Sequence, residues 1–189
     1  MTGLILQLEK PTWRAGWTGV RRRAVRANEP DYQAVCDVLY DAFRESPFAP
    51  GGVFRFGYND DVWTDRFGDA AAIAAEVPAF VRDLLAGRSA LLGTEFPVGT
   101  LEVLFVDSTS LLIFSRPITV DGSVRRVAIG KVAASDFFRT FRRFCASVAS
   151  CVREMPRRPS RIDERARVVQ IFTSIVRDLQ EAELRLARR

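Results

Sequence analysis

Acidic side chains surround a tryptophan in the stretch N-D-D-V-W-T-D-R-F-G-D, where Asp60, Asp61, Asp65 and Asp69 lie around Trp63. Carboxylate oxygens can bind Mg²⁺ or Ca²⁺, but this spacing matches no EF-hand loop and no second carboxylate motif accompanies it. We therefore expect no metal ion here. An aromatic side chain surrounded by charge is typical of an anchor at a protein interface, so the stretch indicates a contact surface. The alternative is that Trp63 packs into the core.

A second acidic set lies on a predicted helix at the spacing i, i+4 and i+8 and consists of Asp37, Asp41 and Glu45. This spacing places the three carboxylates on one face of the helix. The face is either a solvated stripe that Arg44 partly pairs or a contact surface for a basic partner. Taken from both sets, the candidate partner-binding residues are Asp37, Asp41, Asp60, Asp61, Trp63 and Asp65.

The chain contains no histidine, so the commonest general base and the commonest metal ligand are missing. Ser-His-Asp and Cys-His catalysis are therefore excluded. The three cysteines, Cys36, Cys145 and Cys151, are odd in number and lack C-x-x-C spacing, which argues against a disulfide framework and against zinc. No set of residues supplies a nucleophile, a base and an oxyanion site together. We expect a protein that is not an enzyme and that uses no metal and no cofactor.

Arginine dominates the basic residues: of 28 Lys and Arg residues only Lys10 and Lys131 are lysines. The net charge of +5 favours a nucleic acid or an anionic surface as partner. An arginine bias also follows from GC-rich coding, so we give the number of arginines little weight. The distribution of the charge is more informative, because the segments 1–26, 27–99, 100–134 and 135–189 carry +5, −7, +1 and +6.

An acidic segment between basic ends argues against phosphate contacts over the whole surface. Nucleic-acid binding confined to one basic face is the alternative to protein binding. Its candidate residues are Arg21, Arg22, Arg23, Arg142 and Arg143. The row of three arginines at 21–23 also suits a solvent-facing edge strand, where charge prevents aggregation.

Phenylalanines alternate with arginines in S-D-F-F-R-T-F-R-R-F-C, from Ser135 to Cys145. On a helix capped by Ser135, with 100° per residue, the apolar residues of this stretch and its continuation share one arc of roughly 140°. The arginines fall on the opposite side. A platform for stacked bases needs both kinds of side chain on one accessible surface. The apolar arc is therefore predicted to be core; it consists of Phe137, Phe138, Phe141, Phe144, Cys145, Val148, Cys151 and Val152.

Alternating and helical periodicities divide the chain into elements. Strands are predicted at 3–9, 21–26, 53–58, 101–106, 111–120 and 123–132. Helices are predicted at about 30–45, 70–87, 135–154 and 160–189, and residues 59–69 are predicted to form a loop. Pro78 either kinks one helix or begins another, and Gly87 is a candidate C-terminal cap. Asp121-Gly122 predicts a hairpin, so the last three strands form an antiparallel meander.

This pattern predicts an α+β fold: a single domain over residues 1–189, with an antiparallel sheet packed on helices and a C-terminal helical pair. The last helix carries an apolar seam at spacings of 4, 3, 4, 3 and 4. The seam either packs antiparallel on the helix 135–153 or forms an oligomer surface, which would make 160–189 a homodimerisation segment. The seam consists of Val168, Phe172, Ile175, Leu179, Ala182 and Leu186.

In layout, the meander L-E-V-L-F-V…L-L-I-F-S-R-P-I-T-V-D-G-S-V-R-R-V-A-I-G-K-V followed by S-D-F-F-R-T-F-R-R-F resembles the immunity proteins of bacterial polymorphic toxin systems, over residues 94–154. The resemblance implies stoichiometric occlusion of a cognate toxin, with the acidic segment 27–99 as the interface. The start M-T-G-L-I-L-Q-L-E-K lacks the features of a signal peptide, and no run reaches the ~20 apolar residues of a membrane span. We therefore expect a cytoplasmic protein.

Overall fold

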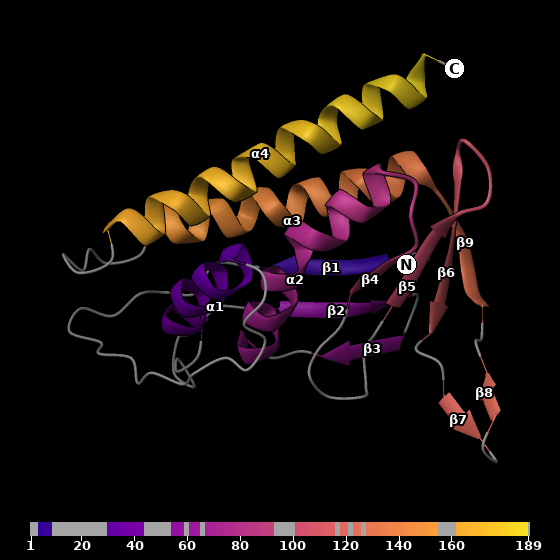
Figure 1. Ribbon diagram of the computed structural model, residues 1–189, viewed down its shortest axis with the longest axis horizontal. Helices are drawn as coiled ribbons and strands as arrows, with labels where there is room; N and C mark the ends of the chain where they lie inside the picture. Colours follow the sequence, from indigo (N-terminus) through magenta and orange to yellow (C-terminus); the bar gives the residue numbers. More distant parts are fainter. Residues whose placement is uncertain are drawn as a thin grey trace.

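The chain combines antiparallel sheets with helices, in agreement with the predicted α+β class (Figure 1). The structure is a computed structural model. It describes residues 4–8, 30–43, 54–58, 61–64, 67–92, 101–115, 118–120, 123–125, 128–154 and 162–188. The helices of this part are α1 (Pro30–Phe43), α2 (Phe67–Leu85), α3 (Ala134–Glu154) and α4 (Ile162–Ala187). None of the described helices is long and apolar enough to cross a membrane.

The first sheet has the order β1-β2-β3 and is antiparallel; its strands are β1 (Leu4–Leu8), β2 (Phe54–Tyr58) and β3 (Asp61–Thr64). Strand β2 alternates as predicted, with Phe54 and Phe56 buried and Arg55 exposed. The prediction of a loop over residues 59–69 was wrong for 61–64, which pair with β2. Four residues are too few to show a period, and Asp61 with its acidic neighbours outside the strand favoured a loop, whereas pairing with β2 gives the backbone groups of β3 hydrogen-bond partners.

The second sheet has the order β4-β5-β6-β9, with strands β4 (Ala90–Leu92), β5 (Leu101–Phe105), β6 (Ser110–Ser115) and β9 (Ala128–Ala133). Strands β5, β6 and β9 confirm the predicted antiparallel meander. Strand β4 was not predicted, because three residues are too few to show a period. The hairpin at Asp121-Gly122 is confirmed as a separate pair, β7 (Ile118–Val120) with β8 (Ser123–Arg125).

Helix α2 continues through Pro78 and ends at a glycine cap. Gly87 has a φ of 74°, a left-handed conformation that costs glycine little. Its N–H donates to the carbonyl of Leu84 at 3.0 Å, and the N–H of Arg88 donates to the carbonyl of Asp83 at 2.9 Å. These two bonds form a Schellman motif. The predicted cap is therefore confirmed, and it fixes the point where the chain leaves α2.

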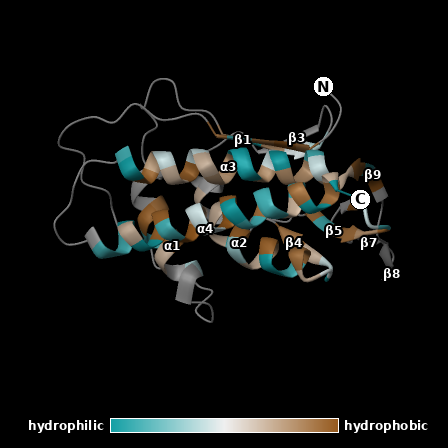
Figure 2. Cartoon of the chain, turned by 90° about the horizontal axis from the view of Figure 1, so that it is seen from above, coloured by the Kyte–Doolittle hydropathy of each residue, from teal (hydrophilic) through white to brown (hydrophobic). Residues whose placement is uncertain are grey.

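Helix α3 is the centre of the core. All eight residues of the predicted apolar arc are buried, and Figure 2 shows apolar and polar residues on different sides of the helices. Aromatic contacts tie α3 to its neighbours: Phe144 lies 6.1 Å from Phe54 of β2, and Phe141 stacks on Phe80 of α2 at 5.0 Å, both between ring centroids. The helix begins at Ala134, one residue before the predicted cap. The interpretation of the phenylalanine–arginine stretch as a core helix is confirmed.

Helix α4 runs antiparallel along α3, so the seam packs on its own chain. At the closed end of the pair, Nη2 of Arg165 donates to the carbonyl of Val152 at 2.8 Å. At the same end of α3, Nη2 of Arg153 donates to Thr173 Oγ1 at 3.1 Å. Val168, Phe172, Ile175 and Leu179 are buried. Packing on the preceding helix, the first of the two alternatives for the seam, is therefore confirmed.

Candidate functional site

The predicted partner-binding residues fall mostly outside the described side chains. Asp37 lies on α1, is half-buried and is engaged in an interaction within the chain. Asp41 also belongs to α1, and Asp61 and Trp63 belong to β3, but the side chains of these three lie outside the described part, as do the residues Asp60 and Asp65. A contact surface on the acidic segment therefore stays a prediction.

The predicted nucleic-acid face is likewise only partly described, because residues 21–23 lie outside the described ranges. Arg143 is exposed on α3. Arg142 is engaged: its Nε and Nη2 donate to the two carboxylate oxygens of Glu183 on α4, at 2.7 and 3.3 Å. These hydrogen bonds raise the pKa of Arg142 above its ordinary value. A guanidinium held in this way on a carboxylate has less capacity left for a phosphate.

The last turns of α4 extend beyond the tightly packed part of the helical pair. The seam residues are buried as far as Leu179, whereas Ala182 and Leu186 are only half-buried. In Figure 1 the two helices diverge toward the C-terminus of α4. The structure therefore leaves room on both sides of the end of α4, and two grooves occupy this space.

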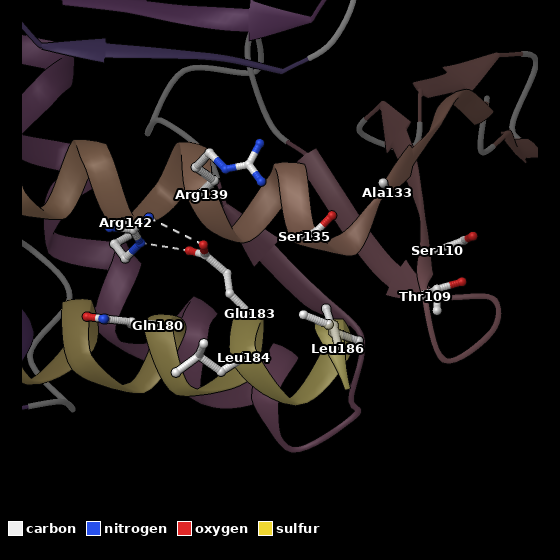
Figure 3. A pocket seen from close by; sticks show the side chains of 11 residues that line it. Thr109, Ser110, Ala133, Ser135, Arg139, Arg142, Gln180, Glu183, Leu184 and Leu186 are labelled. Carbon is white, nitrogen blue, oxygen red and sulfur yellow. Dashed lines mark hydrogen bonds and ion pairs between the residues drawn. The ribbon is translucent and has the colours of Figure 1, made fainter. Parts of the chain in front are cut away.

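The α3–α4 groove, of about 690 Å³, lies between the first turns of α3, the last turns of α4 and the ends of β6 and β9. Figure 3 shows Glu183 extending from α4 to Arg142 on α3 in this groove. Arg139, Ser135 and Thr109 contribute further polar groups. Arg139 is paired with Asp136 at 2.9 Å, so ion pairs within the chain already engage both arginines of the groove.

The α2–α4 groove, of about 770 Å³, lies on the other side of α4. The end of α2, the turn between β5 and β6, and α3 complete its walls. Phe105 and Phe138 form an aromatic floor, in which their ring centroids are 6.2 Å apart in an edge-to-face arrangement. Asp107, Asp178 and Glu181 are the acidic residues that line the groove.

The turn between β5 and β6 borders both grooves, because Asp107 lines one and Thr109 lines the other. Asp107 Oδ1 accepts hydrogen bonds from the backbone N–H of Thr109 at 2.8 Å and from its Oγ1 at 3.0 Å. These bonds lower the pKa of Asp107 to about 2. The carboxylate is thus charged at any physiological pH, and the turn that carries it is held in one conformation.

Large apolar side chains are exposed at this end of the molecule. Leu184 has 51% of its surface exposed and lines the α3–α4 groove, and Leu85 has 38% exposed and lines the α2–α4 groove. Single exposed leucines are ordinary. Their position on two grooves that share Leu186 distinguishes these from isolated cases. The arrangement offers apolar contact area with charged residues at its rim, which is how protein interfaces are built.

Apart from Ala182 and Leu186, which belong to the predicted seam, sequence reasoning missed the groove residues on α4, although their spacing is visible in the sequence. Gln180, Glu183, Leu184 and Ala187 line one groove at the spacing i, i+3, i+4 and i+7. Asp178, Glu181, Ala182 and Arg185 line the other groove at the same spacing. The two sets could therefore have been recognised as stripes on the helix, the second of which includes the seam residue Ala182. The residues of these two stripes line grooves only because α4 diverges from α3.

Comparison of the chain with protein-family models, curated proteins and solved structures finds no match. Within the part of the chain that the structure describes, no three His, Cys, Asp or Glu residues lie together as a metal-binding group. The three cysteines are buried, and none of them forms a disulfide bond within the described part of the chain. Burial raises the pKa of the Cys145 thiol well above its ordinary value, so this sulfur is not the reactive thiolate that nucleophilic catalysis requires.

Proposed function

We propose that this protein is a non-catalytic module that binds another protein, and that the end of the molecule formed by the last turns of α4 is its binding surface. The observation that carries the proposal is the pair of grooves on either side of this end, with Leu184 and Leu85 exposed at their walls. An apolar centre with a charged rim is the usual composition of such interfaces. The resemblance to immunity proteins supplies the class of partner, a toxin that the module blocks by occlusion, whereas the surface proposed here lies mainly on α4 and not on the acidic segment 27–99.

The test is recovery of the partner from the native cells with tagged protein and two matched variants. Leu184→Glu places a charge in the α3–α4 groove. Leu91→Glu places the same charge on β4, where Leu91 is 60% exposed and lines neither groove. We expect one stoichiometric protein to elute with the wild type and with Leu91→Glu, and its yield to fall about tenfold or more with Leu184→Glu, as for loss of an interface anchor.

Titration of the purified partner in a calorimeter then gives the stoichiometry and the affinity of each variant. If the wild type and both variants recover the same protein in equal yield, this surface is not the binding site. If the wild-type protein elutes without any bound protein, the proposed binding function is contradicted. Elution with nucleic acid that moderate salt does not remove would favour the arginine-rich face instead.

A further inference from the structure

The α2–α4 groove has a floor suited to apolar side chains. Phe105 is the partly exposed ring of this floor, and it packs edge to face on Phe138, which is buried in the core and supports it from below. Leu85 and Leu186 extend this apolar surface toward the rim. A rigid floor requires little reorganisation when a ligand docks, which favours binding.

Three of the four charged residues that line the groove are acidic, and each of the three carboxylates also has a basic partner within the chain. Asp107 approaches from the β5–β6 turn, and Asp178 and Glu181 lie on α4; Arg185 is the basic residue among the lining residues. Ion pairs within the chain partly offset these charges: Lys131 lies 3.4 Å from Asp107, Arg177 3.6 Å from Asp178 and Arg185 3.6 Å from Glu181.

These three ion pairs are weak, because the side chains of their cations are 55–78% exposed. Exposed pairs of this kind contribute little, since water solvates both partners. Cations of a docked ligand can therefore join or replace them at the carboxylates. The Asp107 carboxylate is in addition fixed in place by Thr109.

The wall that α4 supplies defines the shape of the ligand. Its lining residues span Asp178 to Leu186, which is a little over two helical turns or roughly 12 Å along the axis. A second helix that lies beside this wall would meet it with its own residues i, i+3, i+4 and i+7. An anionic membrane surface is disfavoured, because the acidic rim would repel its headgroups.

We propose that the α2–α4 groove binds a basic amphipathic helix of the protein partner, with apolar side chains on the aromatic floor and Lys or Arg side chains at the acidic rim. The inference rests on the proposed protein-binding function and specifies the chemistry of the partner. The net charge of the chain, +5, would favour an acidic ligand at long range. A preference for a basic helix must therefore arise locally, in the groove.

The probe is a fluorescein-labelled synthetic peptide of about 14 residues, four helical turns, built from Leu, Ala and Lys with Leu on one face. A matched peptide carries Glu in place of every Lys. Fluorescence anisotropy at low ionic strength measures the binding of both. We expect saturable binding of the Lys peptide and binding of the Glu peptide weaker by about tenfold or more. The affinity for the Lys peptide should fall as salt is added.

Two double variants locate the binding on α4. Asp178→Asn with Glu181→Gln removes two carboxylates from the groove. Asp163→Asn with Glu164→Gln removes two exposed carboxylates from the first turn of the same helix, so the change in net charge is equal. We expect the first pair to weaken binding of the Lys peptide about fivefold or more and the second to change it less than about twofold.

Equal binding of both peptides, no saturable binding of the Lys peptide, or equal effects of the two double variants would each overturn the inference. Failure of the proposed function is distinguishable from these outcomes. It appears as the lack of a Leu184-sensitive partner, whatever the peptides do. A native partner that depends on Leu184 but not on Asp178 and Glu181 would leave the function in place and remove the basic helix as the ligand.

Discussion

At the scale of single residues, the contact between the two larger sheets depends on the lack of a side chain at Gly130. Gly130 lies on β9, and a Cβ built on it would overlap the hydroxyl and the ring of Tyr58 on β2. Tyr58 is itself buried, so it has little room to move aside. A glycine is needed here for close approach and not for its backbone angles.

We expect Gly130→Ala to lower the free energy of unfolding by about 1–3 kcal/mol, as for overpacking of a filled core. Urea denaturation measures this change. Lys131→Ala, at the exposed neighbouring position, is the control and should stay within about 0.5 kcal/mol. If the overlap is the cause, combining Gly130→Ala with Tyr58→Ala should cost less than the sum of the two single changes. If the free-energy costs of the two single changes are additive, the overlap between a side chain at position 130 and Tyr58 is not the cause.

At the scale of elements, α4 is the helix whose role the sequence left open, between packing on its own chain and joining two chains. Phe172 is completely buried and Ile175 is only 7% exposed, whereas Leu184, nine residues after Ile175 and outside the seam, is half exposed. A homodimer through these seam residues would first require α4 to leave α3. The structure therefore assigns the first four residues of the seam, Val168 to Leu179, to the fold of the monomer.

We expect Phe172→Ala to cost about 3–5 kcal/mol of unfolding free energy, as for a phenylalanine removed from a core, and Leu184→Ala about 0.5 kcal/mol or less. Urea denaturation at two protein concentrations measures both. Ile175→Glu should destabilise the protein equally at both concentrations. A seam that joins two chains would instead make stability depend on concentration and would make Ile175→Glu a folded monomer.

The predictable elements are those whose pattern is long or chemically distinctive. Both helix α3 and the residues of its buried arc were predicted, because large apolar side chains recur over 21 residues with a helical period. Asp121-Gly122 predicted its hairpin because few residues other than these adopt the required turn. Strand β4 was missed because it has three residues, and β3 because it has four residues and acidic neighbours.

The grooves could not be predicted in the same way. They form where α4 diverges from the helices and strands beside it, and this divergence depends on tertiary packing. The sequence of α4 fixes which residues share a stripe, but the position along α3 at which α4 ceases to be buried depends on the packing of both helices. Arg142 and Glu183 show the same limit: 41 residues apart in the chain, they meet only because the two helices are antiparallel. Nothing in the sequence around either residue indicates that the other is its partner.

At the scale of the whole molecule, α3 links the parts of the fold to one another. Its phenylalanines contact β2 of the first sheet, β5 of the second sheet and α2, and its other side faces α4. The prediction of a single domain over residues 1–189 requires that these parts unfold together. An element shared by all of them provides the physical reason, because losing α3 removes core contacts from each.

The composition offers a direct test of this cooperativity. Tryptophan occurs three times, at Trp13, Trp17 and Trp63, so indole fluorescence reports on the first third of the chain. Helical circular dichroism is dominated by the last third, where α3 and α4 have 21 and 26 residues. We expect the two signals to give one coincident transition in urea, as two-state unfolding requires. Separate midpoints would divide the chain into independent units, and α3 would then stabilise only the unit that unfolds at the higher concentration of urea.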